Sequence, residues 1–483
     1  MSTGPARTLH LDATYFDTVS LALARWGVTV RSRTGEPGPV WTLKIPVEAI
    51  GSQVQRDEIG FDGPPGAVPA PLVQAVLAYT RGQPLVDVIR LRTTRVTFDI
   101  DVDGRRIATL SDDTVVAGGL ADDTLRTFRE IEIELAADRA DVDADERPDP
   151  VDAVLARLNE AGFEASDVPV GKALRALGPL AFEAPDVTVP NAGKRSPLAV
   201  VVRRAIARSV VQMIGNHAGV CTHDPESLHQ FRVAGRRLRS DLRTFEPLLE
   251  PAWTKSLRDE LGWLGGEVGA GRDADVFAEN LRSALTRLDV PDPNATAALL
   301  QRLDHTVGEA HGRVTKVLSS DRYVSLLDAL VHAAAEPRFS APELERSDAK
   351  RRRTGRRLVK KPWRHLERAV EALAPDSPDS ALHRVRILSK RARYAAEAVA
   401  PLNGGAAKRF ADAIAKVQTV LGSHHDSAVA EMWLCDAATA VPETRALVDE
   451  LLIVERDERA RLRDEFDDLW KVVSRPKRRR WLQ

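Results

Sequence analysis

The sequence reads His-Gln-Phe-Arg-Val-Ala-Gly-Arg-Arg-Leu-Arg at residues 229–239 and His-Arg-Val-Arg-Ile-Leu-Ser-Lys-Arg-Ala-Arg at residues 383–393. The two stretches match at an offset of 154 residues, with five His or basic positions in register. A single His-x-x-Arg carries little information, but five matched positions indicate an internal duplication. We therefore expect the C-terminal part of the chain to contain two copies of one structural unit.

The match continues on both sides of these stretches at an offset of 153 residues. The further matched positions are Arg203, Arg204 and Arg208 with Arg356, Arg357 and Lys361, and Gly269 and Asp273 with Gly422 and Asp426. This whole part of the chain has helical periodicity interrupted by short loops. It predicts an all-α domain over residues 196–475, built from two packed helical bundles at about residues 196–335 and 350–475.

Each repeated stretch places its cations on one face of a helix. At 100° per residue, an arc of about 80° contains most of them. The members are His229, Arg232, Arg236, Arg239 and Arg243 in the first copy and His383, Arg386, Lys390 and Arg393 in the second, with Arg237 and Arg391 to one side. Cations three or four positions apart repel one another until an anion binds. Arg also donates two parallel hydrogen bonds to phosphate, so the stripes predict a phosphate-polyanion site; a solvated helix face is the alternative.

His229 and His383 begin the two stripes, and neither has Cys or carboxylate companions at the spacing of zinc ligands. We expect the neighbouring arginines to lower the pKa of each imidazole. A neutral histidine would donate a hydrogen bond to a phosphate oxygen, or it would gain its charge when the anion binds. A packing role at the start of the helix is the alternative.

The N-terminal part of the chain has the period-two alternation of β-strands. The alternating segments are residues 28–33, 41–45, 89–92, 96–102 and 131–135. Asp103-Gly104 between two of them favours a hairpin turn. We predict an antiparallel sheet with one charged face over residues 1–178, closed by a helix near residues 151–163. A proline-rich linker over residues 179–195 would join it to the helical domain, which makes the chain an α+β multidomain protein.

Several charged side chains share strand faces in this first domain. The cations are Arg31, Arg33, Lys44, Arg90 and Arg92, and the carboxylates are Glu130, Glu132 and Glu134. If these faces point into a closed sheet, the cations would bind a triphosphate and the glutamates would hold Mg²⁺ or Mn²⁺. Faces that simply meet water are the alternative.

Composition narrows the class of protein. A chain of 483 residues with 43% hydrophobic and 29% charged residues is long and apolar enough for globular domains. Two cysteines exclude a disulfide framework, and without a signal sequence or a long apolar run we expect a cytoplasmic protein. The formal charge is −11 for residues 1–193 and +10 for residues 194–483. One part therefore handles anions, or the two parts attract each other.

The duplicated stretches, Tyr394 and the Gly-x-x-x-Asp elements ending at Asp273 and Asp426 resemble the CHAD family, the conserved histidine α-helical domains. The resemblance implies a two-bundle helical fold with a basic groove that binds inorganic polyphosphate without a cofactor, in proteins often found at polyphosphate granules. The residues that match the family pattern are His229, Arg232, Arg236, Arg237, Arg239, His383, Arg386, Lys390, Arg391 and Arg393. Arg204, Arg208, Arg357 and Lys361 would line the same groove.

The first domain resembles the CYTH family of triphosphate tunnel metalloenzymes over residues 8–178. The matching elements are Tyr15-Phe-Asp-Thr18, the strand with Arg31 and Arg33, Trp41-x-Leu-Lys44-x-Pro46, residues 90–95, the strand of Glu130, Glu132 and Glu134, and the helix at residues 172–177. The resemblance implies an eight-stranded antiparallel β-barrel of tunnel-like form and a triphosphatase that uses Mg²⁺ or Mn²⁺. The family also begins with a Glu-x-Glu-x-Lys strand, which residues 1–12 do not contain.

Three functions follow from these observations. The first is polyphosphate binding by the helical domain, beside a CYTH-like domain that binds or hydrolyses triphosphate. The second is a metal-dependent inorganic triphosphatase fed by the helical domain. The third is nucleic-acid binding, which the 5% aromatic content disfavours because single-strand binders stack bases on aromatic rings. No membrane partner is expected.

Overall fold

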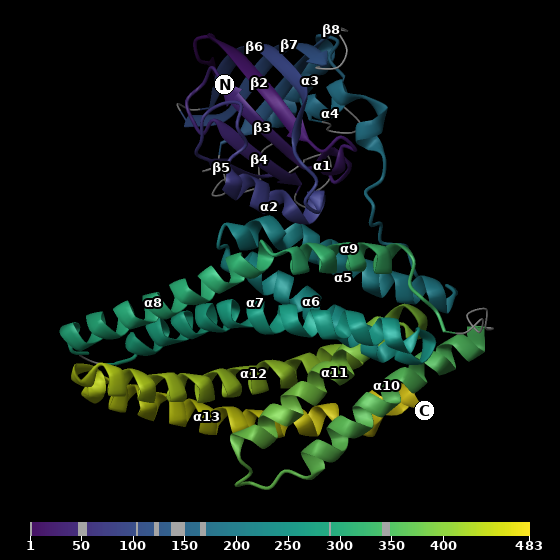
Figure 1. Ribbon diagram of the computed structural model, residues 1–483, viewed down its shortest axis with the longest axis vertical. Helices are drawn as coiled ribbons and strands as arrows, with labels where there is room; N and C mark the ends of the chain where they lie inside the picture. The colour runs from purple at the N-terminus through teal and green to yellow at the C-terminus, as the bar shows by residue number, and fades with distance from the viewer. Residues whose placement is uncertain are drawn as a thin grey trace. The chain divides into compact units, whose positions relative to one another are not determined.

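The computed structural model describes residues 2–46, 56–102, 105–119, 125–136, 150–164, 171–288, 291–340 and 348–483 (Figure 1). The chain forms two compact units, residues 1–185 and residues 186–483. The division falls inside the predicted linker. The hairpin turn predicted at Asp103-Gly104 lies outside the described residues, although the strands on either side of it pair with each other.

The first unit is built on an antiparallel sheet. Its strands are β1 (Ser2–Thr3), β2 (Arg7–Asp17), β3 (Thr29–Thr34), β4 (Trp41–Pro46), β5 (Arg56–Phe61), β6 (Val86–Val102), β7 (Arg105–Gly119) and β8 (Leu125–Leu135). The order is β5-β4-β3-β2-β6-β7-β8, with β1 paired to β6. In the described residues β5 and β8 do not pair, yet side chains from both line one cavity. The sheet therefore curls into the predicted tunnel-like form.

The first unit also contains short helices. They are α1 (Ala22–Arg25), α2 (Ala70–Thr80), α3 (Pro150–Glu160), α4 (Lys172–Leu177) and the 3₁₀ turn η2 (Pro179–Phe182). Asp17, which is 3% exposed, accepts hydrogen bonds from the backbone N–H groups of Thr18, Leu23 and Ala24. This carboxylate ties the end of β2 to α1, so the Tyr-Phe-Asp-Thr element has a structural role.

The elements described in the second unit are helices, as predicted. Its first copy contains α5 (Leu198–Cys221), α6 (Pro225–Phe245), α7 (Pro251–Leu285), α8 (Pro293–Leu318) and α9 (Asp321–Ala335). Its second copy contains α10 (Asp348–Glu371), α11 (Asp379–Asn403), α12 (Gly405–Ala440) and α13 (Arg445–Val473), followed by the short α14 (Pro476–Arg479). Figure 1 shows the long helices α7 and α12 in the middle of this unit.

The two helical copies share a hydrophobic core. Phe277 and Leu281 of α7 belong to the same buried cluster as Leu434 of α12 and Leu451 of α13. The helices that carry the basic stripes, α6 and α11, also pack against each other. Burial of this apolar surface holds the copies in a fixed relation, which places the two stripes beside each other. None of the described helices is both long and apolar enough to cross a bilayer.

Candidate functional site

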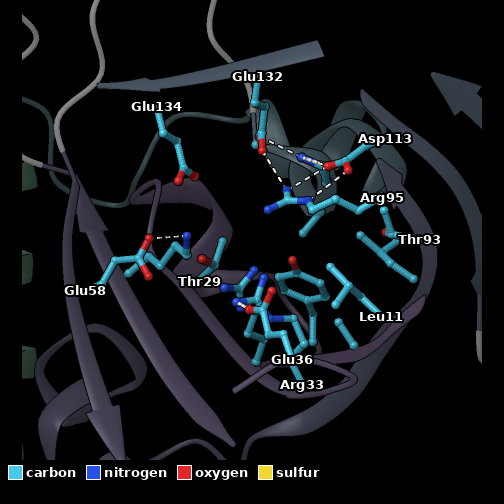
Figure 2. Close-up of a pocket in the computed structure, with 18 residues that line it drawn as sticks. Leu11, Thr29, Arg33, Glu36, Glu58, Thr93, Arg95, Asp113, Glu132 and Glu134 are labelled. Atoms are coloured by element: carbon cyan, nitrogen blue, oxygen red, sulfur yellow. Dashed lines mark hydrogen bonds and ion pairs between the residues drawn. The ribbon is translucent and has the colours of Figure 1, made fainter. Parts of the chain in front are cut away.

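The curled sheet of the first unit encloses a cavity of about 500 Å³ (Figure 2). Its charged lining is balanced, with five basic and five acidic side chains. They are Arg31, Arg33, Lys44, Arg95 and Lys172, and Glu36, Glu58, Asp113, Glu132 and Glu134. A cavity with cations and carboxylates on its walls has the composition needed to hold a phosphate anion together with a metal cation.

One wall of this cavity is basic and comes from β3 and β4. Arg31 is 8% exposed, and its Nε makes no hydrogen bond within the described structure. Arg33 forms an ion pair with Glu36, and Lys44 with Glu58. Burial, reinforced by Arg31, lowers the pKa of Arg33 to about 10 and also lowers the pKa of Lys44. The wall thus has more positive charge than its carboxylates neutralise, and an anion would relieve the repulsion.

The opposite wall carries three carboxylates that converge. Ligand oxygens of Asp113, Glu130 and Glu132 lie within 4.8 Å of one another. Strand register explains part of this arrangement, because Asp113 on β7 is paired with Glu130 on β8 and with Arg95 on β6. Carboxylate oxygens are the donors that Mg²⁺ and Mn²⁺ prefer, so this set fits the metal expected for the family.

Two cations contact these carboxylates. Arg95 donates two hydrogen bonds to Asp113, at 2.9 and 2.7 Å, and one to Glu132 at 2.9 Å. The Lys172 ammonium lies 2.6 Å from both Glu130 and Glu132 and 3.0 Å from Asp113. Burial alone would lower the pKa of Lys172, but the glutamates outweigh it and raise that pKa. The pKa of Glu132 is lowered, because Lys172 and Arg95 outweigh its burial.

The structure brings some predicted residues to the cavity and leaves others outside. Arg31, Arg33, Lys44, Glu132 and Glu134 line it, and Glu130 contacts it through Lys172. Arg90 and Arg92 do not line it. Leu91, Thr93 and Arg95 are the residues of β6 that face inward, so the even-numbered positions face out, where Arg90 donates to Asp12 at 2.8 and 2.6 Å.

Five charged residues of this cavity were not among the predicted site residues. They are Glu36, Glu58, Arg95, Asp113 and Lys172. Asp113 and Arg95 could have been predicted from the sequence. Each lies in an alternating strand, on the same face as buried apolar neighbours. Lys172 enters the cavity from α4, outside the sheet, and its sequence signal was the family resemblance of the helix at residues 172–177.

The second unit contains a distinct cluster, the two-helix basic face. We define it as His229, Arg232, Arg236, Arg239 and Arg243 of α6 together with His383, Arg386, Lys390 and Arg391 of α11. The two helices touch where Arg236 donates to the Tyr394 hydroxyl at 3.2 Å. The charges of Arg236, Arg386 and Arg232 act on Lys390 and lower its pKa. The charge of Arg239 acts in the same way on Arg391. The duplicated stripes therefore face a common region.

The cations of this face repel one another. Burial lowers the pKa of Lys390 to about 6, and Arg236 and Arg386 add to the effect. Burial also lowers the pKa values of Arg386, Arg243 and Arg391, with further contributions from neighbouring arginines. Two carboxylates offset part of the charge. Asp273 of α7 accepts from Arg232 at 2.6 Å, and Asp426 of α12 lies 3.8 Å from Arg386. The cations outnumber these acids, so the face attracts anions.

The histidines occupy equivalent places in the two copies. Burial lowers the pKa of His229, with Arg272 as the next cause, and the pKa of His383 is lowered by burial and Arg386. Both directions agree with the prediction. The His383 Nδ1 lies 3.1 Å from the Nδ1 of His425. Arg272 and His425 occupy matching positions, directly before Asp273 and Asp426. Neither is among the predicted binding residues, although the two Gly-x-x-x-Asp elements that contain them align.

Other predicted binding residues lie away from this face. Arg237 and Arg393 both contact Glu397, at 2.5 and 2.7 Å. Arg204 donates to the Pro190 carbonyl, and Arg208 lies close to the buried Asp241. Arg357 and Lys361 are exposed on α10 without an ion pair to any described residue. Arg237, Arg393 and Arg204 thus have partners within the fold, whereas the buried Nε atoms of Arg208 and Arg237 make no hydrogen bond within the described structure.

The comparisons with known proteins agree with these two units. The CYTH domain model matches residues 4–147 and the CHAD domain model matches residues 204–435. An uncharacterized Mycobacterium tuberculosis protein, MT2285 in strain CDC 1551 and Rv2226 in strain H37Rv, is 30% identical over 449 residues, which is 90% of this chain and 83% of the relative.

Two solved structures are also similar. PptA from Streptomyces chartreusis has a TM-score of 0.49 at 24% identity, covering 57% of this chain and 100% of that one. The CHAD domain from the plant Ricinus communis has a TM-score of 0.47 at 24% identity, covering 59% of this chain and 95% of that one. From the matched domains and the M. tuberculosis relative, the chain belongs to the CYTH–CHAD family, whose domains are associated with triphosphate and polyphosphate.

Proposed function

We propose that the protein binds inorganic polyphosphate through the two-helix basic face. The observation that carries the proposal is the pairing of two duplicated cationic stripes on α6 and α11, which depress one another's pKa values. From His229 to Arg243 a stripe extends about 21 Å at 1.5 Å per residue. A flexible chain of phosphates contacts such a stripe at many points, whereas a single small anion contacts one.

Polyphosphate fits this face better than nucleic acid does. Arginine forks bind phosphate oxygens directly, while single-stranded nucleic acid also needs aromatic rings for base stacking. Of the residues described in contact with the basic face, Tyr394 is aromatic, and it is only 2% exposed. A ligand that consists of phosphate alone requires no such platform. Excess polyphosphate should therefore displace tRNA, and excess tRNA should fail to displace polyphosphate.

The cavity of the first unit supports a second function, the binding of triphosphate with a divalent cation. Arg31, Arg33 and Lys44 would neutralise the phosphates, and Asp113, Glu130 and Glu132 would hold Mg²⁺ or Mn²⁺. The buried Nε of Arg31, which has no partner within the described structure, favours an anion at the basic wall. A bound divalent ion supplies a Lewis acid for phosphate chemistry. Release of phosphate from tripolyphosphate with Mg²⁺ or Mn²⁺ separates hydrolysis from binding alone.

The main proposal is tested by titrating the full chain with long-chain polyphosphate at about 150 mM salt. The variant R236E/K390E places two carboxylates at the centre of the face and should weaken binding more than about 100-fold. The control R313E/K316E makes the same two kinds of substitution at two exposed cations of α8. We expect the control to bind within about threefold of wild type, because rim charges screened by salt contribute little.

Circular dichroism and thermal melting of both variants establish that the helices remain folded. Tight binding by a folded R236E/K390E protein would reject the two-helix basic face as the polyphosphate site. Equal losses in the two variants would reject it as well, since the effect would then follow total charge rather than position.

A further inference from the structure

Lys172 has an unusual place in the CYTH cavity. Its ammonium lies within 3.0 Å of carboxylate oxygens from Asp113, Glu130 and Glu132, the three residues whose oxygens converge as a metal-binding set. An ammonium has three N–H donors, and here each has a carboxylate to meet. The side chain therefore occupies the middle of the carboxylate set.

The fold holds this lysine in place. Lys172 is the first residue of α4, and Ala173 and Ala176 of the same helix are buried against Leu91 of β6 and Val115 of β7. The side chain is only 12% exposed. Packing of α4 on the sheet thus inserts one positive charge into the cavity at a fixed point, in contrast to a flexible surface lysine that samples many positions.

We propose that Lys172 is an internal cation that competes with a divalent metal ion for Asp113, Glu130 and Glu132. This inference rests on the metal-and-triphosphate function proposed for the cavity. A metal ion coordinates carboxylate oxygens at about 2.0–2.2 Å and carries two charges, so it cannot share the centre of the set with an ammonium. Binding of the metal requires Lys172 to leave the carboxylates and turn its charge toward the cavity, where a phosphate would lie.

Arg175 provides a matched comparison on the same helix. Of the three carboxylates it forms an ion pair with Glu130 alone, at 3.2 Å, and its side chain is 40% exposed. Loss of Arg175 removes one cation from the neighbourhood without opening the centre of the carboxylate set. A general effect of positive charge would change metal affinity similarly for both residues, whereas direct competition would change it for Lys172 alone.

The experiment measures Mn²⁺ binding to the full chain without any phosphate ligand, by calorimetry and by the electron paramagnetic resonance of free Mn²⁺. We expect K172M to bind Mn²⁺ at least about tenfold more tightly than wild type, because a competing charge has been removed. K172R should keep the weak binding of wild type, and R175A should stay within about threefold of it. Binding in K172M should disappear on adding E132Q, which locates the ion.

The alternative outcomes are distinct. Equal affinities of wild type and K172M would leave the metal site in place and reject competition by Lys172. Weaker binding by a folded K172M would also reject it, since Lys172 would then position the carboxylates for the metal. If neither protein bound Mn²⁺, the metal part of the proposed function would fail together with this inference.

Discussion

Lys172 in the cavity and Lys390 on the two-helix basic face are both largely buried, but their surroundings move their pKa values in opposite directions. Three carboxylates surround Lys172, and its pKa is raised. Burial and three arginines lower the pKa of Lys390 to about 6. The cavity therefore balances its charge within the fold, while the basic face leaves an excess of positive charge for a ligand to neutralise.

If both sites bind phosphate as proposed, this difference separates two ways of binding it. A cavity with balanced charge binds ligands according to their shape. An anion can enter only if it displaces carboxylates from their cations or binds together with a metal ion. A face with excess positive charge binds ligands according to their charge density, because any long polyanion reduces the repulsion among its cations. We expect the cavity to discriminate among small phosphates and the face to discriminate by chain length.

Among single substitutions, the largest expected effect concerns the basic wall of the cavity. R31A should weaken tripolyphosphate binding about 100-fold, because it removes a buried fork that can donate two charged hydrogen bonds. R92A should bind within about twofold of wild type, since Arg92 does not line the cavity. Calorimetry with Mg²⁺ present measures both, and thermal melting shows whether R31A folds. Similar affinities for the two variants would remove Arg31 from the site.

The structure also shows which features a sequence can predict here. The duplication, the helical unit and the antiparallel sheet follow from periodicity, because hydrophobic spacing is written into the chain. The inward face of β6 does not, since alternation gives two faces and only the curl of the sheet decides which one is inside. For this reason Arg90 and Arg92 were predicted at the cavity, where the structure places Arg95.

A similar limit applied to the helical unit. Helical spacing predicted that Arg393 would lie with His383, Arg386 and Lys390, but it cannot show which partner a neighbouring helix presents. Glu397 stands one turn along α11 and accepts from Arg393 at 2.7 Å, and it also contacts Arg237 of α6. Partners of this kind depend on how helices pack, so they become visible only in three dimensions.

A smaller effect is expected from the protonation of Lys390. In the free protein its pKa is about 6, so at pH 8 the amine is neutral, and a bound polyphosphate should raise that pKa toward the ordinary value of 10.5. Binding at pH 8 therefore takes up part of a proton, and with a bound pKa just above 7 the affinity should fall about tenfold between pH 6 and pH 9. His229, His383 and His425 have lowered pKa values and remain neutral at pH 8.

Calorimetry in buffers of different ionisation enthalpy measures this proton uptake directly. K390R keeps its charge throughout the range, so its affinity between pH 7.5 and 9 should be flat and its proton uptake near zero. Uptake that persists in K390R would assign the proton to another group. An affinity that rises with pH in wild type would contradict the predicted sign.

The smallest effect concerns the carboxylates that offset the basic face. D273N removes the partner that accepts from Arg232 at 2.6 Å and should tighten polyphosphate binding about threefold, in line with the modest strength of exposed ion pairs. D426N should act in the same direction but less, because its oxygen lies 3.8 Å from Arg386 and its pKa is already raised by burial.

The control D304N breaks a comparable exposed pair, 2.7 Å from Arg282, and should leave affinity unchanged. An equal gain in D304N would mean that total charge alone sets the affinity. A loss of affinity in D273N would mean that Asp273 holds Arg232 in its binding geometry. In that case the basic face would resemble the cavity, with carboxylates that orient cations, and the contrast between the two regions would lie in the number of acids and not in their role.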